Sequence, residues 1–244
     1  MTTPPSVVGV DGCRTGWVCA YTTAHALHIE TLHSFSVVRD LAVELDAERV
    51  LVDIPIGLPE TGRRSCDSIA RELMGSRAAT VFYAPVRAVL DESTHERASA
   101  VNRAQSGYGL SVQAWHLVPK IREVDAVLQT HPDARGRILE AHPELAFRAF
   151  AGEPLSAKKS TEAGRSRRLE LLRDEFGDAD PEAVYRETVA QTYRKDVARD
   201  DVIDALVLAA SARRPLESHP ASPPTDATGL PMAIHEPLTS TREM

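Results

Sequence analysis

Two aspartates stand where a folded sheet would bring carboxylates together. Asp11 ends the β-branched run that begins at Val7, and Asp53 ends the apolar run that begins at Val50. Each is followed by turn residues, and ligands of open α/β sheets gather beyond the carboxyl ends of the strands. Unpaired carboxylates in one crevice repel each other, and a hard divalent cation with oxygen ligands removes that cost. The pair predicts a site for Mg²⁺ or Mn²⁺.

Two further aspartates lie on the last strongly apolar segment, which is expected to be a buried helix over 201–213. Asp201 and Asp204 are three residues apart and therefore share one face of that helix. Asp201 could instead cap the helix N-terminus, whereas Asp204 lies a turn further inside. We predict that both join Asp11 and Asp53 as metal ligands.

A fifth carboxylate, Glu144, follows His142 and Pro143 at the end of an expected strand. It is a candidate ligand because oxygen suits magnesium or manganese, and His142 could instead serve as a general base. The alternative is a plain turn stabilised by Pro143. Two metals held roughly 3.5–4 Å apart by such carboxylates can activate a water and stabilise a leaving oxygen in phosphodiester cleavage. The predicted catalytic set is Asp11, Asp53, Asp204, Asp201 and Glu144.

Basic residues gather in two places that could meet a phosphate. Lys158, Lys159 and Arg168 lie in a stretch where Glu162 is the only acid, which is typical of a basic loop leading into a helix. Arg14 directly follows the first acidic strand end and would lie near a phosphate held there. The competing interpretation is a solvated helix face or a structural role. A second group, diluted by acids, is assigned to a solvated helix face: Arg63, Arg64, Arg71 and Arg77.

Hydrophobic periodicity predicts an α/β fold with a mixed sheet in the order β-β-β-α-β-α-β-α. Strands are expected at 7–11, 17–22, 26–32, 50–54 and 138–139, and helices at 37–45, 64–74, 112–128, 181–194 and 201–213, with a shorter helix after Ser93. Pro119 should kink or interrupt its helix. The predicted organisation is a domain over 1–214 with a helical insertion at about 60–135, a Pro-rich linker at 215–228, and a C-terminal extension at 229–244. The extension should pack back on the domain, with an edge strand near 230–234.

Composition limits the class of protein. The 244 residues are 43% hydrophobic. Their net charge of −7 disfavours extensive non-specific binding of DNA but permits a local basic groove. No run approaches the roughly 20 apolar residues of a membrane span, and the N-terminus lacks a secretion signal. A cytoplasmic protein without membrane contact is therefore expected. Three cysteines without CxxC spacing argue against a disulfide framework or a thiolate zinc site.

The segment from Val8 to Trp17 resembles the first-strand motif of the ribonuclease H-like superfamily, most nearly its Holliday-junction resolvase branch. The run that begins Asp201-Val-Ile-Asp204 resembles that branch's C-terminal helix, which carries a metal-binding Asp. Asp53 falls at the end of the fourth strand, where the resemblance implies a second acidic ligand. The implied fold is therefore ribonuclease H-like, with a helical insertion between the fourth and fifth strands.

The chain is more specifically similar to the domain of unknown function 429 family, described as predicted nucleases of ribonuclease H fold. The similarity covers nearly the whole chain, through segments 8–17, 53–59, 64–67, 142–147 and 229–234 together with Lys158, Lys159 and Arg168. It implies a fold and a nuclease activity. The family has no settled reaction to carry over.

Three functional hypotheses remain open. The first is a Mg²⁺- or Mn²⁺-dependent nuclease acting on DNA or RNA. The second is a hydrolase of nucleotides or small phosphoesters in the same crevice, which the net negative charge slightly favours; an actin-like phosphotransferase is disfavoured because such proteins carry a duplicated domain. The third is a catalytically silent module that binds nucleic acid or a protein. The sequence leaves the oligomeric state open, with a homodimer among the options.

Overall fold

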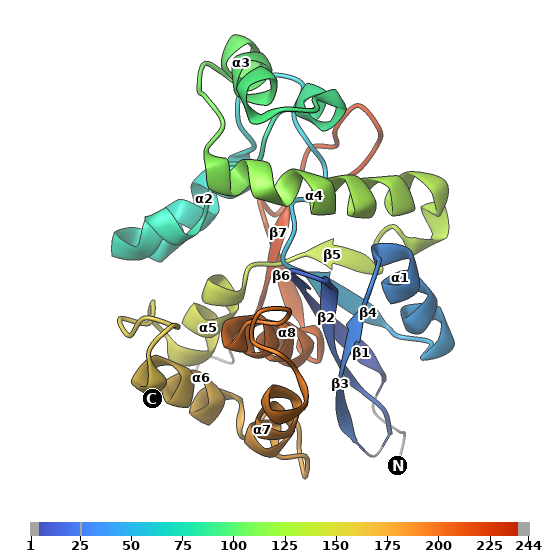
Figure 1. Ribbon diagram of the computed structural model, residues 1–244, viewed down its shortest axis with the longest axis vertical. Coiled ribbons are helices and arrows are strands. Elements are labelled where there is room, and N and C mark those ends of the chain that lie inside the picture. The colour runs from blue at the N-terminus through green and yellow to red at the C-terminus, as the bar shows by residue number, and fades with distance from the viewer. Residues whose placement is uncertain (1–4, 25, 239–244) are drawn as a thin grey trace.

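The computed structural model describes residues 5–24 and 26–238. Within them the chain forms a five-stranded mixed sheet, a separate two-stranded sheet and eight α-helices (Figure 1). The predicted mixed α/β fold is confirmed at this level. None of the helices in this part of the chain combines the length and the hydropathy that a bilayer-spanning segment needs.

The main sheet has the strand order β3-β2-β1-β4-β5. Strands β1 (Val7–Cys13), β2 (Gly16–Thr22) and β3 (Leu27–Leu32) form an antiparallel meander. Helix α1 (Phe35–Glu44) then returns the chain, so that β4 (Arg49–Val52) runs parallel to β1 and β5 (Ile138–Glu140) runs parallel to β4. The carboxyl ends of β1, β4 and β5 therefore meet at one edge of the sheet.

Alternation along β1 divides the core into two layers. Val8 and Val10 point to the face that α1 and α4 cover, together with Trp17. Val7 points to the opposite face, which is covered by α5 and α8 and includes Val18. All three cysteines are free and buried, as predicted. The sheet is thus covered on both faces, and Asp11 lies on the α8 side because it is two residues beyond Gly9 and four beyond Val7.

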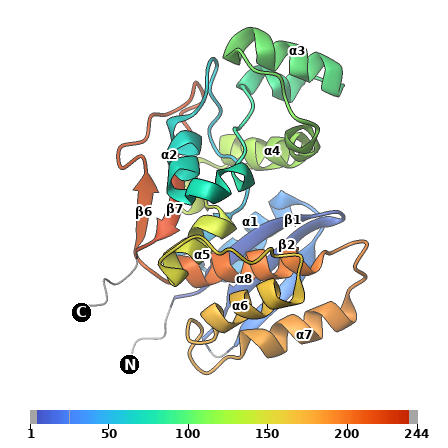
Figure 2. The same cartoon turned by 90° about the vertical axis from the view of Figure 1, so that its left-hand side faces the viewer.

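The chain between β4 and β5 carries three α-helices and three short 3₁₀ helices and lies at one end of the sheet (Figures 1 and 2). Gly75 ends the helix over Ser65–Met74 with φ of 52°. Thr94, rather than Ser93, caps the helix over His95–Ser106 through its hydroxyl. The fourth helix runs through Pro119 without a break; Pro119 lies on the exposed side, where the unpaired carbonyl can bond water. The elements are α2 (Ser65–Met74), the short 3₁₀ helices η1 (Gly75–Thr80) and η2 (Arg87–Asp91), α3 (His95–Ser106), α4 (Val112–Thr130) and η3 (Pro132–Ala134).

Four helices follow β5 and cover one face of the sheet (Figure 2): α5 (Pro143–Ala151), α6 (Glu162–Leu172), α7 (Pro181–Gln191) and α8 (Arg199–Ala212). Asp180 caps α7 through its side chain, as its pairing with Pro181 predicts. Helix α7 ends at Gln191, three residues before the expected end.

The predicted Pro-rich linker is more ordered than expected. Strand β6 (Leu216–His219) lies within it and pairs antiparallel with β7 (Ile234–Pro237). The strand expected near 230–234 therefore begins at its last residue and pairs with β6, while a single parallel bridge between His235 and Ala141 links it to the chain directly after β5, at the edge of the main sheet. The loop between β6 and β7 is held by Asp226, because its carboxylate accepts hydrogen bonds from the backbone N–H groups of Leu58 and Leu230. Residues 239–244 of the predicted extension lie outside the described residues.

Candidate metal centre

The parallel pairing of β1 and β4 brings Asp11 and Asp53 side by side. Val10 pairs with Val52, and the N–H of Asp53 donates to the carbonyl of Val10 at 3.1 Å. The next residue on each strand is an aspartate, so the two side chains leave the same face at neighbouring positions. Both are partly buried, and Asp11 Oδ1 accepts a hydrogen bond from the Gly12 N–H at 2.8 Å.

Helix α8 brings Asp204 to the same place because it packs directly on β1. A Cβ added at Gly9 would lie 2.1 Å from the backbone N of Ala209 and 2.2 Å from the carbonyl O of Ala205. Only glycine permits this approach. Asp204 precedes Ala205 on α8, and its carboxylate is buried, with 1% of the residue exposed.

The three carboxylates form one electrostatic group. Burial raises the pKa of Asp11 well above its ordinary value, and the charges of Asp204, Asp53 and Asp201 raise it further. Burial raises the pKa of Asp204 to about 7, against the opposing charge of Lys159. Burial also raises the pKa of Asp53, with Glu144 adding to the effect and His142 and Lys159 opposing it. The site thus holds more negative charge than its own cations balance.

Lys159 does not point away from the protein as a basic loop residue would. Its Nζ lies 2.6 Å from Asp204 Oδ2 and 3.5 Å from Asp200 Oδ2, and its pKa is raised in spite of partial burial. The other oxygen, Asp204 Oδ1, is buried without a hydrogen-bond partner. A buried carboxylate oxygen left unpaired is costly, so this atom calls for a cation or a water.

Asp201 takes the capping role that competed with its ligand role. Its Oδ2 accepts a hydrogen bond from the backbone N–H of Ala198 at 2.8 Å, just before α8 begins. Burial raises its pKa to about 6. It remains close enough to affect the pKa of Asp11, and so it lies at the margin of the group.

Glu144 lies in the first turn of α5, not in a turn after β5, and only 5% of it is exposed. Arg168 Nη2 donates to its Oε1 at 2.6 Å, and Oε2 has no hydrogen-bond partner. Arg168 itself is fully buried and also donates to the carbonyls of Ala157 and Gly164. A side chain without exposed surface cannot meet a phosphate from solvent, so this placement gives Arg168 the task of holding Glu144.

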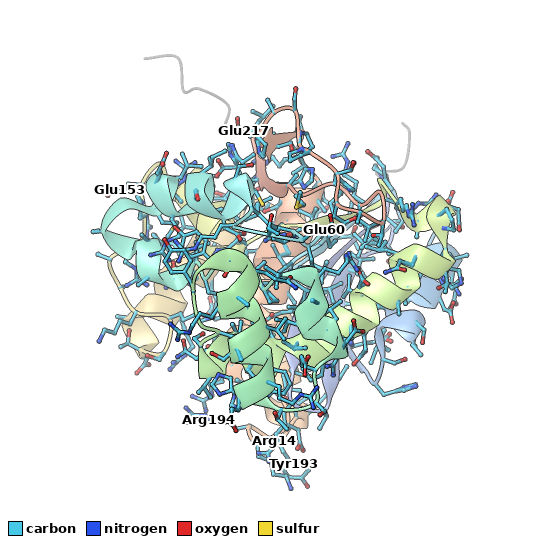
Figure 3. The ribbon with its side chains drawn as sticks, turned by 90° about the horizontal axis from the view of Figure 1, so that it is seen from above. Arg14, Glu60, Glu153, Tyr193, Arg194 and Glu217 are labelled. Atoms are coloured by element: carbon cyan, nitrogen blue, oxygen red, sulfur yellow. The ribbon has the colours of Figure 1, made fainter. Side chains whose placement is uncertain are left out.

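The remaining predicted phosphate contacts are exposed. Arg14 lies in the turn after Asp11, at the edge of the molecule in Figure 3, and Lys158 is exposed beside Lys159. Lys120 of α4, which the sequence did not single out, lies beside the same turn. Its Nζ is 4.2 Å from the ring centroid of Trp17, and a Cβ on Gly12 would lie 2.8 Å from its Cδ.

The donor set fits a divalent cation in chemistry, though not yet in spacing. All of the donors are carboxylate oxygens, which Mg²⁺ and Mn²⁺ prefer. The ligand atoms of Asp11, Asp53 and Asp204 do not, however, all lie within 4.8 Å of one another. Within residues 5–24 and 26–238, the one group of three acidic, histidine or cysteine residues that meets this spacing is Glu217, His219 and Glu236.

That second group is already satisfied. His219 Nε2 lies 2.6 Å from Glu236 Oε1, and Arg148 Nη2 donates to both oxygens of Glu236 at 2.7 and 2.8 Å. The hydrogen bonds from His219 and Arg148 lower the pKa of Glu236 in spite of burial. A cation would have to displace an arginine there. The aspartate group, with its unpaired oxygen, is the better candidate.

The sequence profile of the family described as "Protein of unknown function (DUF429)" matches residues 9–228. The chain belongs to this family. No curated protein and no solved structure matches the chain. The matched range contains every carboxylate described above, and so the candidate centre lies within the part that defines membership of DUF429.

In this DUF429 protein a buried network of ion pairs holds the loop that follows Asp53. The Arg64 guanidinium donates to both oxygens of Glu140 at 2.7 and 2.8 Å, to Asp67 Oδ1 at 2.5 Å and to the carbonyl of Ile56 at 3.1 Å. It therefore fixes the loop after Asp53 against α2 and the end of β5. The prediction that Arg64 lies on a solvated helix face is wrong, because only 2% of it is exposed. The spacing of Arg64 and Asp67, three apart at the start of a helix, was the available signal.

Proposed function

We propose that this protein is a Mg²⁺- or Mn²⁺-dependent nuclease that hydrolyses phosphodiester bonds of DNA or RNA. The observation that carries the proposal is the buried, unpaired Asp204 Oδ1 in a group with Asp11 and Asp53, in which the charges of Asp204 and Asp53 add to the effect of burial in raising the pKa of Asp11. A fold of ribonuclease H type is part of the proposal. The carboxylates at the ends of β1 and β4 and on α8 occupy the places that the resemblance implies, which supports it.

Asp11, Asp53 and Asp204 would hold the metal, with Asp201 or Glu144 completing the set. A bound divalent cation supplies an activated water and stabilises the leaving oxygen in phosphodiester cleavage. Gly9 fixes the depth at which α8 packs and so the position of Asp204. The Ala198 N–H and Arg168 hold Asp201 and Glu144 in place. Lys159 neutralises part of the charge and can turn toward a phosphate, since 42% of its side chain is exposed.

His142 is suited to accept a proton beside this group. Its Nε2 lies 3.3 Å from the carbonyl O of Thr80, which can only accept, so Nε2 carries the ring proton. Its Nδ1 is buried without a partner and keeps its lone pair free. His142 also lies close enough to Asp53 to affect the pKa of that carboxylate. We assign His142 Nδ1 as the general base or as a relay for the proton of the attacking water.

The phosphate contacts of this proposal are few. Lys159 contacts Asp204 directly, and the other candidates are the exposed Arg14 and Lys158 and, beside the turn after β1, Lys120. The net charge of −7 disfavours the binding of a long duplex. That charge keeps hydrolysis of a free nucleotide or another small phosphoester as the second candidate in the same centre. In both candidates the bond cleaved is a phosphoester, and the set of substrates in the assay separates them.

The experiment is a cleavage assay of the purified protein with Mn²⁺ on labelled single-stranded, duplex and branched DNA and RNA, and on nucleoside phosphates. We expect metal-dependent cleavage of at least one polynucleotide, and Asp11→Asn should reduce it by at least roughly a hundred-fold, as loss of a group central to the reaction does. Asp46→Asn is the matched control, because 97% of its side chain is exposed. Undiminished cleavage by Asp11→Asn would show that a contaminant or another site is responsible.

A further inference from the structure

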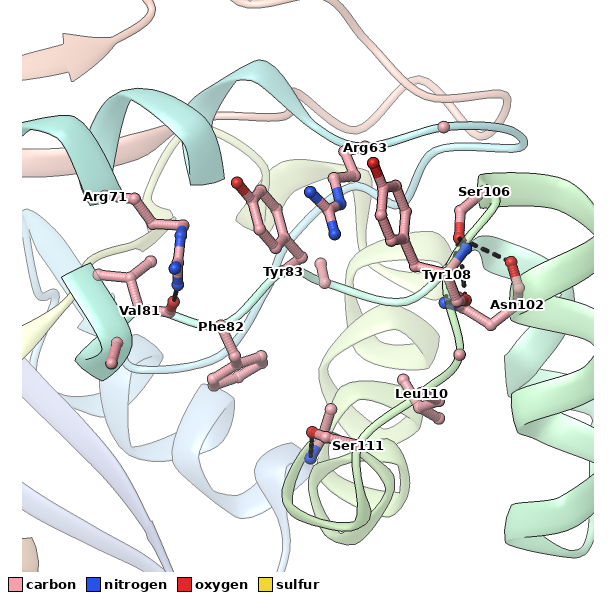
Figure 4. A pocket seen from close by; sticks show the side chains of 15 residues that line it. Arg63, Arg71, Val81, Phe82, Tyr83, Asn102, Ser106, Tyr108, Leu110 and Ser111 are labelled. Carbon is pink, nitrogen blue, oxygen red and sulfur yellow. Dashed lines mark hydrogen bonds between the residues drawn. The ribbon is translucent and has the colours of Figure 1, made fainter.

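A second hollow lies near the candidate centre, between the start of α2, the chain after η1 and the α3–α4 loop (Figure 4). Its volume is about 330 Å³. Polar and aromatic side chains line it, among them Arg63, Arg71, Tyr83, Asn102, Ser106 and Tyr108. This mixture differs from the aliphatic core beneath it and is typical of a ligand site.

Arg63 is stacked between two tyrosines at the mouth of this hollow. Its guanidinium carbon lies 3.7 Å from the ring centroid of Tyr83 and 3.5 Å from that of Tyr108 (Figure 4). Arg63 is exposed, and no carboxylate in the described part of the chain lies within 4.0 Å of its nitrogens. Two aromatic faces thus enclose one flat cationic group that no acid holds. We call this arrangement the tyrosine slot.

The walls of the tyrosine slot are fixed before any ligand arrives. Asn102 Nδ2 donates to the carbonyl of Tyr108 at 2.8 Å, and Asn102 Oδ1 accepts from the N–H of Val86 at 3.0 Å. Arg71 donates to the carbonyls of Ala78 and Val81, on the chain that leads into Tyr83. Both tyrosines therefore stand on anchored backbone, while 53% of Tyr108 remains exposed. Without a ligand, Arg63 occupies the space between the two rings, so a ligand would take its place there.

The tyrosine slot shares a wall with the candidate metal centre. Val81 and Phe82 line the larger hollow, and both also line a small cavity of about 20 Å³ whose other walls include Asp53 and His142. The hollow therefore lies next to the cavity that Asp53 lines. This contact ties the slot to the chemistry of the centre.

We infer that the tyrosine slot binds a nucleobase of a single-stranded segment of the substrate, while Arg63 turns outward to the neighbouring phosphate. Every base has a π-face, so aromatic side chains stack on single strands with little regard to sequence, and arginine meets phosphate through two parallel hydrogen bonds. A duplex keeps its bases stacked inside and cannot fill the slot without unpairing. The inference rests on the proposed nuclease function and narrows it to substrates with an unpaired strand.

The same ligand chemistry could come from a strand or from a free nucleotide, and a binding assay without divalent metal separates them. We would measure fluorescence anisotropy of labelled single-stranded and duplex oligonucleotides at low salt in EDTA, so that no cleavage occurs. Tyr108→Ala should weaken single-strand binding at least roughly five-fold, the lower end of what loss of one stacked base costs. Tyr108→Trp should keep it, since indole stacks as well. Tyr193→Ala is the matched control, a tyrosine that is 75% exposed and lies near Lys195 instead.

Competition with a nucleoside monophosphate then shows whether the slot binds a free nucleotide or only a base within a strand. If the slot binds bases, the concentration of monophosphate needed to displace the strand should change with the affinity of each Tyr108 variant. If it does not change, or if single-strand binding is unaffected by Tyr108→Ala, the slot does not bind bases. If the monophosphate displaces the strand and this displacement depends on Tyr108, the slot also binds free nucleotides. If the monophosphate does not displace the strand, the slot binds bases only as part of a strand.

Two results would overturn the inference outright. The first is wild-type protein that binds duplex as tightly as single strand. The second is a Tyr108→Ala variant with unchanged affinity for the single strand; a lowered unfolding midpoint of that variant would then show that the stack only stabilises the fold. Tyr108-dependent binding without any metal-dependent cleavage would instead contradict the nuclease proposal and leave the slot standing, so the two failures are distinguishable.

Discussion

At the scale of residues, the candidate centre is defined by uncompensated negative charge. Asp11, Asp53 and Asp204 lie together, and Lys159 is the one cation that bonds directly to any of them in the described residues. Burial raises the pKa of all three, so the folded protein binds protons at this place more tightly than the unfolded chain does. A site built in this way weakens the fold unless something positive enters it.

This imbalance gives a pH-dependent prediction. Because the folded-state pKa values are raised, these carboxylates lower the free energy of unfolding as pH rises from about 4 through about 7, where Asp204 titrates. Asp11→Asn removes one charge and keeps the acceptor for the Gly12 N–H. Without metal, it should therefore raise the unfolding midpoint at pH 8 by about 3 °C or more, since one unit of pKa is worth about 1.4 kcal/mol.

The measurement is thermal unfolding in EDTA at pH 8 and pH 5. The gain should shrink as the pH is lowered, because the raised pKa of Asp11 favours its neutral form in the folded state. Asp46→Asn, at an exposed position with φ of 45° that asparagine tolerates, should change neither midpoint. An Asp11→Asn variant no more stable than wild type at pH 8 would show that these charges do not repel each other as described.

At the scale of elements, the packing of α8 on β1 places the third carboxylate. Gly9 is the contact point, and the alternation along β1 puts Gly9 and Asp11 on the α8 side and Gly12 on the α4 side. The atoms that a Cβ on Gly9 would meet are backbone atoms of Ala205 and Ala209, which cannot turn aside. The atom that a Cβ on Gly12 would meet is Cδ of the flexible Lys120 side chain.

Gly9→Ala should therefore be costly and Gly12→Ala cheap. Overfilling a packed interface costs about 1–3 kcal/mol, and a clash with helix backbone belongs at the top of that range or beyond. We expect Gly9→Ala to lower the unfolding midpoint by roughly 6 °C or more, and Gly12→Ala by about 2 °C or less. Thermal unfolding of both variants checks this. Equal midpoints would mean that α8 does not lie on β1 as closely as described.

Local signals predicted elements well where a single side chain or backbone group decides the outcome. The pairing of Asp180 with Pro181 predicted the start of α7, and Gly75 predicted the end of α2. Strand β6 was missed, because the prolines around it suggest a linker, whereas its order comes from pairing with β7 and the following loop is held by the hydrogen bond from the Leu58 N–H to Asp226. Contacts between residues this far apart leave no periodicity in the sequence.

At the scale of the whole molecule, the sheet, the helices after β5 and the helical segment before it converge on one region. β1 and β4 supply Asp11 and Asp53, α8 supplies Asp204, and the helical segment supplies the tyrosine slot (Figures 1 and 4). The hollow at the slot and the small cavity beside Asp53 share Val81 and Phe82. The arrangement allows one part of a substrate to be held while another is brought to the carboxylates.

The sequence predicted the carboxylates of this region better than their partners. Strand ends and helical spacing identify Asp11, Asp53 and Asp204 directly, because both features are local. The partners depend on distant contacts: Arg168 turned inward to Glu144, Lys159 to Asp204, and Arg64 to Glu140. A run of basic residues does not reveal which of its members will be buried.

The measurement that tests the central claim most directly is calorimetric titration of Mn²⁺ into the protein at pH 8, above the pKa of about 7 of Asp204, because ligands must lose their protons to bind a metal. We predict a saturable binding signal in wild type and in Asp46→Asn, and its loss in Asp11→Asn and in Asp204→Asn. If Mn²⁺ produced no signal, or bound Asp11→Asn as tightly as wild type, Asp11, Asp53 and Asp204 would not form a metal centre.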